Sequence, residues 1–178
     1  MASACASIAA ILQTHESAIE TQATLEQTRI VSKQLGSSLW PYLAFTRSVS
    51  LTSISIGFAN DGLGPALIRS FTISVDNRPV TRLSAVIDDI DPRPRQRGRR
   101  VGEADFGAGA VLRPSESVTI ISISDKQLSD ARAETVMNRA RFNVCYCSLL
   151  DDCWWLESPD NEPHAVHACP HQRAPISM

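Results

Sequence analysis

The chain of 178 residues is long enough for one domain with a hydrophobic core and one further element, but it is short for two domains. Its net charge of -2 and its aromatic content of 6% argue against the basic surfaces and stacking platforms of nucleic-acid-binding proteins. No apolar run reaches the length of about eighteen residues that a membrane-spanning helix needs. The N-terminus lacks a basic residue before its short apolar segment, which argues against a signal peptide. Both a cytosolic start and a start downstream of an omitted membrane anchor fit it.

The first element that we expect is a long helix from about Ser7 to Leu35. This segment contains no Pro or Gly and is rich in helix-favouring residues, and Gly36 stands where a glycine would end the helix. Its apolar residues form only a weak stripe, which indicates a stalk or a weak homodimer helix rather than a tight coiled coil. A helix laid across the domain surface is the alternative. We therefore expect a helix at residues 1–36 and a β domain with a C-terminal tail at residues 37–178.

Alternating apolar residues then predict two strands, at about residues 49–58 and 67–75. The phase of the first run changes near Thr52 and Ser53, which predicts a bulge or a break there. Between the runs, the sequence NDGLGP provides glycines for positive φ and Asn/Asp side chains that bond the local backbone, so we expect a hairpin or a corner. The sequence DNRP at residues 76–79 predicts a second turn.

The next segment, from Asp88 to Ala110, carries Pro, Gly and clustered charge without an apolar period, which predicts a long exposed loop. Arg97 belongs to its arginine cluster, which faces several aspartates of the same loop. One interpretation is a patch for a small anion or an acidic partner. The other is a solvated loop in which opposite charges largely cancel.

The last third of the chain predicts a Pro-Ser-Glu turn that leads into a strand within Arg113–Ser124, a short helix within Lys126–Arg139 and a strand at RFNVCYCSL. After Trp155 comes a tail with little pattern. About six short strands separated by turn signals favour a mainly β protein, built as an antiparallel β-sandwich, over a βαβ arrangement.

The stretch FNVCYCSLLDDCWW contains three cysteines and two tryptophans. Because side chains alternate along a strand, Cys145 and Cys147 share the face opposite the one that carries Phe142, Val144 and Tyr146. A turn at residues 148–152 places Cys147 opposite Cys153, at a spacing near that of a disulfide. Cys147–Cys153 is therefore the favoured bridge, and Cys145 is expected to pair with the tail, at Cys169.

Other states of these sulfurs remain open, inert free thiols among them. The alternative metal site is zinc, with Cys145, Cys147, Cys153, Cys169 and His167 as candidate ligands. Their spacings lack the paired C-x2-C motif that makes a zinc prediction strong. A Cys nucleophile with a His base has no diagnostic local signature here, and neighbouring cysteines would oxidise one another. We therefore expect no enzymatic activity and no cofactor, with zinc as the alternative.

Three stretches, SLWPYLAF, FANDGLGPALIRSFTISVDNRPV and VCYCSLLDDCWW, together resemble uncharacterised bacterial envelope proteins. In that group a membrane helix and a polar helical linker precede a small immunoglobulin-like β domain. The resemblance covers about Leu39 to Trp155 in patches. It implies an immunoglobulin-like sandwich facing the periplasm and a membrane segment that this chain does not include. It provides no catalytic role that could be carried over to this chain. It also implies a structural turn built by Asn60, Gly62, Gly64 and Pro65.

We expect a non-enzymatic envelope module for interaction or assembly, stapled by disulfides, with an unknown protein partner. Its candidate contact residues are Trp155 and Arg97. The alternative is a cytoplasmic zinc-binding domain that uses the Cys/His cluster of residues 145–171.

Overall fold

The structure is a computed structural model that describes residues 21–36, 38–50, 52–82, 86, 100–103, 105–124, 134–135 and 138–170. The chain divides into two compact units, Met1–Ser38 and Leu39–Met178. Within the described ranges, no helix is both long enough and apolar enough to cross a membrane.

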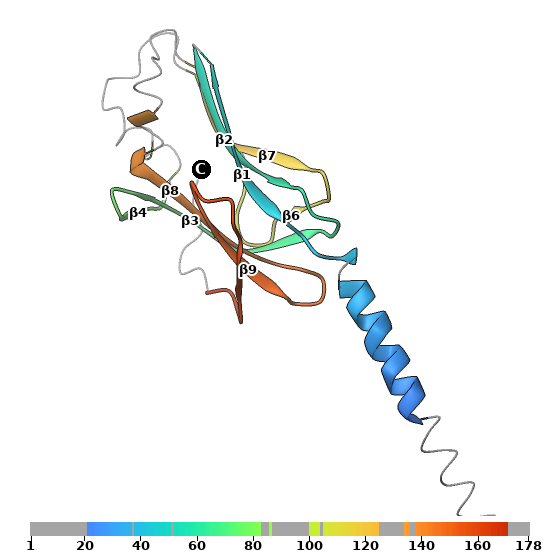
Figure 1. The fold of residues 1–178 in the computed structure, drawn as a ribbon. Coiled ribbons are helices and arrows are strands. Elements are labelled where there is room, and N and C mark those ends of the chain that lie inside the picture. The colour runs from blue at the N-terminus through green and yellow to red at the C-terminus, as the bar shows by residue number, and fades with distance from the viewer. Residues whose placement is uncertain are drawn as a thin grey trace, which may run out of the picture. The chain divides into compact units, whose positions relative to one another are not determined.

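The described part of the first unit is helical over residues 21–36 (Figure 1). The start of the predicted helix, Ser7 to Glu20, lies outside the described residues. The prediction that Gly36 ends the helix is wrong, because Gly36 and Ser38 are themselves helical. The Ser38 hydroxyl donates a hydrogen bond to the carbonyl of Gln34 at 2.9 Å, as in a continuing helical turn. Glycine inside a helix costs only about 1 kcal/mol relative to alanine, so it need not stop one.

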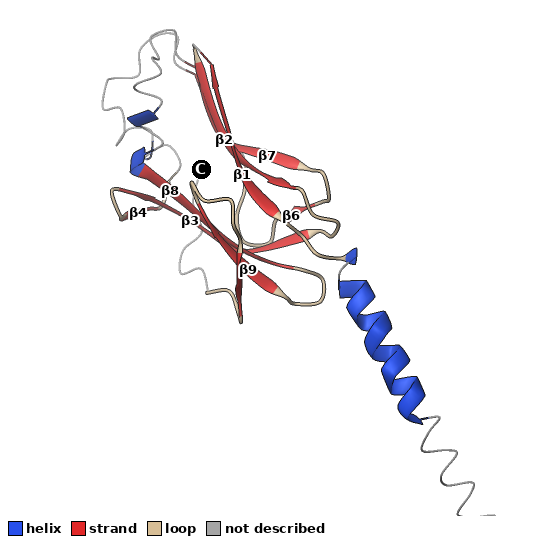
Figure 2. Ribbon diagram, viewed as in Figure 1, coloured by secondary structure: helices blue, strands red, loops and turns tan. Residues whose placement is uncertain are grey.

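The second unit is mainly β, in two antiparallel sheets, as the sequence predicts (Figure 2). The four strands of the first sheet are, in spatial order, β1 (Leu43–Ser50), β2 (Ser53–Asn60), β7 (Ser117–Ser124) and β5 (Arg100–Glu103). The second sheet has the order β10 (His164–Val166), β9 (Cys153–Glu157), β8 (Ala140–Cys147), β3 (Ala66–Val75) and β4 (Arg78–Val80), and β6 (Val111–Leu112) pairs with β3.

The two sheets share one hydrophobic core. Phe58 of β2 meets Phe71 of β3 edge-on, with ring centroids 6.1 Å apart. Phe45 of β1 stacks on Phe142 of β8, with centroids 5.8 Å apart. Because side chains from both sheets interdigitate, the sheets pack face to face as the layers of a β-sandwich do.

Three of the expected connections take a definite form. At Thr52 the chain reverses rather than bulges, so that β1 and β2 form a hairpin with Ser50 opposite Ser53. The segment NDGLGP is a corner and not a hairpin, because β2 and β3 belong to different sheets. The turn expected at residues 76–79 joins β3 to β4 at Asp76 and Asn77, and Arg78 and Pro79 already belong to β4.

The pairing of β3 with β8 contains an irregularity that the sequence pattern did not predict. The register shifts between Ile68 and Ser70, which leaves Arg69 as an extra residue. Ala66 and Ile68, and not the predicted Leu67, are therefore the buried side chains of β3 before the bulge. Such a bulge changes which face each side chain takes without changing the composition of the strand.

The segment predicted as a long exposed loop contains residues that belong to the fold. Residues 100–103 form β5, an edge strand paired with β7, and Phe106 is buried in the core. Edge strands tolerate charge and glycine, which is why this one looks like a loop in sequence. Arg97 and the other arginines before residue 100 lie outside the described residues. Of the helix expected at residues 126–139, the described residues 134–135 and 138–139 are helical.

Candidate functional site

The late hairpin, β8 and β9, has the register that the sequence predicts. Tyr146 lies opposite Trp154, and Cys145 lies opposite Trp155. Phe142, Val144 and Tyr146 are fully buried in the core, so the cysteines occupy the other face of the sheet. The chain after β9 returns as β10, which pairs with β9 and forms the edge of this sheet.

Both disulfides are the pairings that the sequence favours. Cys147 is bonded to its cross-strand neighbour Cys153, and Cys145 is bonded to Cys169 in the tail. Cys145 is 0% exposed, Cys147 2% and Cys153 8%. One bond closes the hairpin and the other ties the tail to β8.

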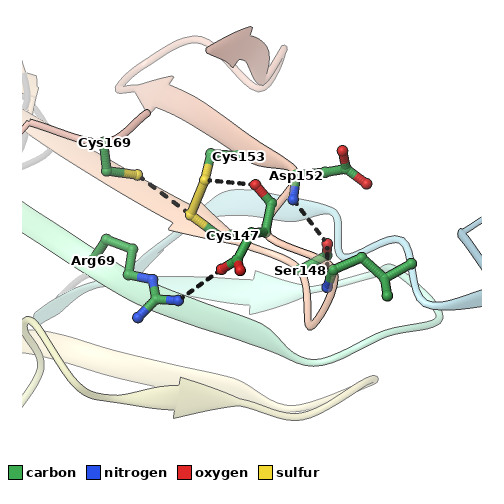
Figure 3. Close-up of polar contacts among 8 residues, drawn as sticks. Arg69, Cys147, Ser148, Asp152, Cys153 and Cys169 are labelled. Atoms are coloured by element: carbon green, nitrogen blue, oxygen red, sulfur yellow. Dashed lines mark hydrogen bonds and ion pairs between the residues drawn. A yellow bond between two sulfur atoms is a disulfide. The ribbon is translucent and has the colours of Figure 1, made fainter. Parts of the chain in front are cut away.

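The two disulfides touch each other. The Sγ atoms of Cys147 and Cys169 lie 3.7 Å apart (Figure 3). Both sulfurs are in disulfides and carry no hydrogen, so this is a van der Waals contact. The Sγ atoms of Cys147, Cys153 and Cys169 all lie within 4.8 Å of one another. We call the four residues Cys145, Cys147, Cys153 and Cys169 the sulfur cluster.

The turn between β8 and β9 is fixed by the side chain of Ser148. Its hydroxyl oxygen accepts hydrogen bonds from the amides of Leu150 and Asp152, at 3.1 and 3.3 Å. The Ser148 amide donates to the carbonyl of Asp152 at 2.8 Å. Asp151 takes the left-handed backbone conformation and forms an exposed ion pair with Arg69. The sulfur cluster therefore sits beside a turn of defined shape.

The candidate zinc ligands are brought together only in part. The sulfurs of Cys147, Cys153 and Cys169 lie within 4.8 Å of one another, and the Cys145 sulfur is bonded to that of Cys169. His167 is exposed and does not belong to this group. Zinc binds cysteine as thiolate. The cluster therefore offers ligands to a metal only after its disulfides are reduced.

Trp155, a predicted contact residue, is half-buried beside the sulfur cluster. Its neighbour Trp154 packs toward the core and stacks on Tyr146, with ring centroids 5.8 Å apart. Side chains alternate along β9, so Trp155 points to the outer face. There it lies between Cys145 of β8 and His164 of β10.

Asn60 is a fully buried residue that holds three segments together. Its Oδ1 atom accepts hydrogen bonds from the amides of Tyr42 and Gly62, at 3.2 and 3.1 Å. Its Nδ2 atom donates to the carbonyls of Gly64 and Leu112, at 2.8 and 3.0 Å. The bond to Gly62 is the local one that the sequence predicts, whereas the partners at Tyr42 and Leu112 are remote in sequence and could not be foreseen.

The glycines of this corner have a different reason from the predicted one. Neither Gly62 nor Gly64 has a positive φ. A Cβ at Gly62 would overlap the backbone of Trp40 and Tyr42, and a Cβ at Gly64 would overlap the carbonyl of Leu39. These glycines are therefore required by the close approach of two backbone segments. Pro65, half-buried, follows them and leads into β3.

Exposed apolar side chains gather at the same end of the domain. Leu63 lies in the corner between β2 and β3. Leu67, near the start of β3, pairs with Val111 of β6 and with Cys147 of β8, so β6 and the β8–β9 turn lie at the same end. The five exposed residues are Trp40 (44%), Leu63 (71%), Val111 (50%), Leu149 (55%) and Leu150 (45%). We call them the turn-end surface. This surface was not predicted from the sequence, although leucines in turn segments, where polar residues are usual, are a signal of it.

Comparison with known proteins gives no matching family model and no significant match to a curated protein or to a solved structure. What this chain does is therefore inferred from its own residues.

Proposed function

We propose that the β domain is an immunoglobulin-like, non-enzymatic module for interaction or assembly on the periplasmic face of a bacterial inner membrane. The N-terminal helix would join it to a membrane segment. The sulfur cluster is the observation that carries this proposal, because structural disulfides persist in oxidising compartments and are rare in the cytosol. The face-to-face antiparallel sheets support a sandwich, and the resemblance of the turn and hairpin motifs supports its immunoglobulin-like form and its periplasmic setting.

The turn-end surface is the part of this domain that we assign to a protein partner. Large apolar side chains that stay exposed in clusters mark interaction sites more often than single ones do. The surface is also preformed. The amides of Leu63 and Gly64 donate to the carbonyl of Trp40, at 2.9 and 3.2 Å, and Asn60 ties this corner to Leu112. A preformed surface loses less conformational entropy on binding.

Trp155 stays a second candidate contact, since it is half-buried on the outer face beside the sulfur cluster. Arg97, the other candidate from sequence, lies outside the described residues.

Site-specific photocrosslinking in a bacterial cell tests the docking surface. A photoreactive amino acid replaces Leu63 or Leu149 in the membrane-anchored protein, and a matched control replaces Arg78, exposed in the β3–β4 hairpin at the other end of β3. We expect one discrete protein adduct from positions 63 and 149 and none from position 78. Equal adducts from all three positions, or none from positions 63 and 149, would show that this surface is not a docking site.

A zinc-binding domain in a reducing compartment is the second candidate, because the sulfurs of Cys147, Cys153 and Cys169 lie within 4.8 Å of one another. Alkylation of the denatured, non-reduced protein distinguishes the envelope proposal from the zinc candidate. The envelope proposal predicts that only Cys5 is modified, since the four cysteines of the sulfur cluster are paired. The zinc candidate predicts five modified thiols, a zinc mass on the native protein, and unfolding by a chelator.

A further inference from the structure

We propose that the sulfur cluster is a thiol-exchange site, at which an incoming thiol is captured as a mixed disulfide on Cys153. The ligand class is a protein or small-molecule thiolate. This activity goes beyond the proposed docking function and does not depend on the turn-end surface.

The contact between the two disulfides carries the inference. The Sγ atom of Cys147 lies 3.7 Å from the Sγ atom of Cys169, although each is bonded to a different cysteine. Disulfide exchange begins when a thiolate approaches one sulfur of a disulfide. If Cys147 were released from Cys153, its sulfur would already touch the second disulfide.

The first step opens the hairpin bond. An external thiolate attacks the Cys153 sulfur, a disulfide forms between that thiol and Cys153, and the bond between Cys147 and Cys153 breaks. Cys147 leaves as a thiolate. Within the hairpin bond, attack at Cys153 is favoured over attack at Cys147, because Cys153 is 8% exposed and Cys147 only 2%. Cys169 is more exposed than either, so capture on Cys169 is the competing outcome that the test must distinguish.

The second step removes the thiolate that would reverse the first. Cys147 attacks the Cys169 sulfur, a bond forms between Cys147 and Cys169, and the bond between Cys145 and Cys169 breaks. Cys145 leaves as a thiolate and takes a proton from water. Two disulfides exist before and after the reaction, one thiol is consumed and one is produced, so there is no net oxidation or reduction.

The position of Cys145 favours retention of the captured thiol. A lone hairpin disulfide would close again, because the released thiolate stays beside the mixed disulfide. After the second step the free thiol belongs to Cys145, which is 0% exposed and pairs with Ser70 and Trp155 on the neighbouring strands. Free cysteine is well suited to such burial, where it stays protonated and unreactive.

Reduced glutathione is the probe for the test. The full chain with Cys5→Ser is incubated with glutathione and quenched with acid, and is then digested in acid with a protease that cleaves at aromatic residues. Cleavage at Tyr146 separates Cys145 from Cys147. We expect glutathione on Cys153, a new link between Cys147 and Cys169, and a free thiol at Cys145. Glutathione on Cys169 with Cys147–Cys153 intact, no adduct, or no Cys147–Cys169 link would overturn the proposal.

The matched variant is Cys145→Ala/Cys169→Ala in the same background, which keeps the hairpin disulfide and removes the second one. Its adduct on Cys153 should fall at least about fivefold, because Cys147 can only return to Cys153. An equal yield would overturn the proposal. If the variant does not fold, Cys153→Ala gives an independent readout. It leaves a free Cys147, which should partly replace Cys145 in the bond to Cys169 without added thiol, and an unchanged Cys145–Cys169 bond would contradict the mechanism.

Discussion

Gly64 lies so close to the chain entering the β domain that any side chain at this position would meet backbone. A Cβ there would overlap the Leu39 carbonyl, whereas a Cβ at Gly107 would have no neighbour within 4 Å. Gly64→Ala should therefore lower the free energy of unfolding by about 2 kcal/mol or more. Gly107→Ala, the matched control, should change it by less than about 0.5 kcal/mol. Urea unfolding without reductant measures both, and equal midpoints would contradict the close approach.

Tyr146 links residue chemistry to stability at high pH. It is fully buried, its hydroxyl oxygen accepts a hydrogen bond from the Leu43 amide, and burial raises its pKa to about 12. The folded state therefore keeps the phenol proton longer than the unfolded chain, whose tyrosine pKa is about 10. The resulting stability, up to about 2 to 3 kcal/mol, is present below pH 10 and lost as the pH rises through 12.

The tyrosinate absorbance of Tyr42→Phe measures this shift, because Tyr146 is then the remaining one of two tyrosines. The folded protein should titrate near 12 and the denatured protein near 10. Titration near 10 in both states would show that Tyr146 is not buried in the folded protein.

The individual residues whose role could be predicted from the sequence are those whose contacts are local. The cysteine pairings followed from strand alternation and one short turn. Asn60, which was expected in a turn, is the last residue of β2, and its bonds to Tyr42 and Leu112 depend on how remote segments meet. Gly62 and Gly64 were also expected in this corner. They are required there because the backbone of residues 39–42 approaches them closely, and not because of a positive φ.

The two disulfides should contribute unequally to the free energy of unfolding. Cys145–Cys169 spans 24 residues in sequence and Cys147–Cys153 spans only 6. Closing a longer loop removes more entropy from the unfolded chain. Loss of Cys145–Cys169 should therefore lower the free energy of unfolding by about 3 to 4 kcal/mol, and loss of Cys147–Cys153 should lower it by about 2 kcal/mol. The variants Cys145→Ala/Cys169→Ala and Cys147→Ala/Cys153→Ala remove two sulfurs each. Their urea midpoints test the order, and a larger loss for the hairpin pair would contradict it.

The strands that sequence patterns found are those with one buried face. The alternation in β8 is strong because Phe142, Val144 and Tyr146 are all fully buried. The pattern fails at β5 and β10, short edge strands of four and three residues. An edge strand is held by backbone hydrogen bonds to one neighbour, which any residue except proline provides, so its composition carries little information. The bulge at Arg69 was missed for a related reason, since only the pairing with β8 reveals it.

Mainly antiparallel β structure followed from the alternating apolar residues and the turn signals, and the helix that the structure describes at residues 21–36 followed from helix-favouring residues. How the helix functions is a separate question. Four of its apolar residues are exposed, Leu25 at 65%, Ile30 at 52%, Val31 at 61% and Leu35 at 49%. At 100° per residue, Leu25, Val31 and Leu35 fall within an arc of about 120°, and Ile30 lies outside it.

This narrow stripe fits weak self-association, in agreement with the homodimer helix that the sequence suggests. Leu35→Gln should weaken the dimer at least about tenfold, because burial of one leucine contributes about 1.5 to 3 kcal/mol. Ile30→Gln is the matched control, since glutamine favours helix equally in both variants and position 30 lies off the stripe. Sedimentation equilibrium of the full chain measures the association. If the chain stays monomeric at high concentration, or if both variants weaken the dimer equally, the stripe is not an interface and the helix acts only as a stalk.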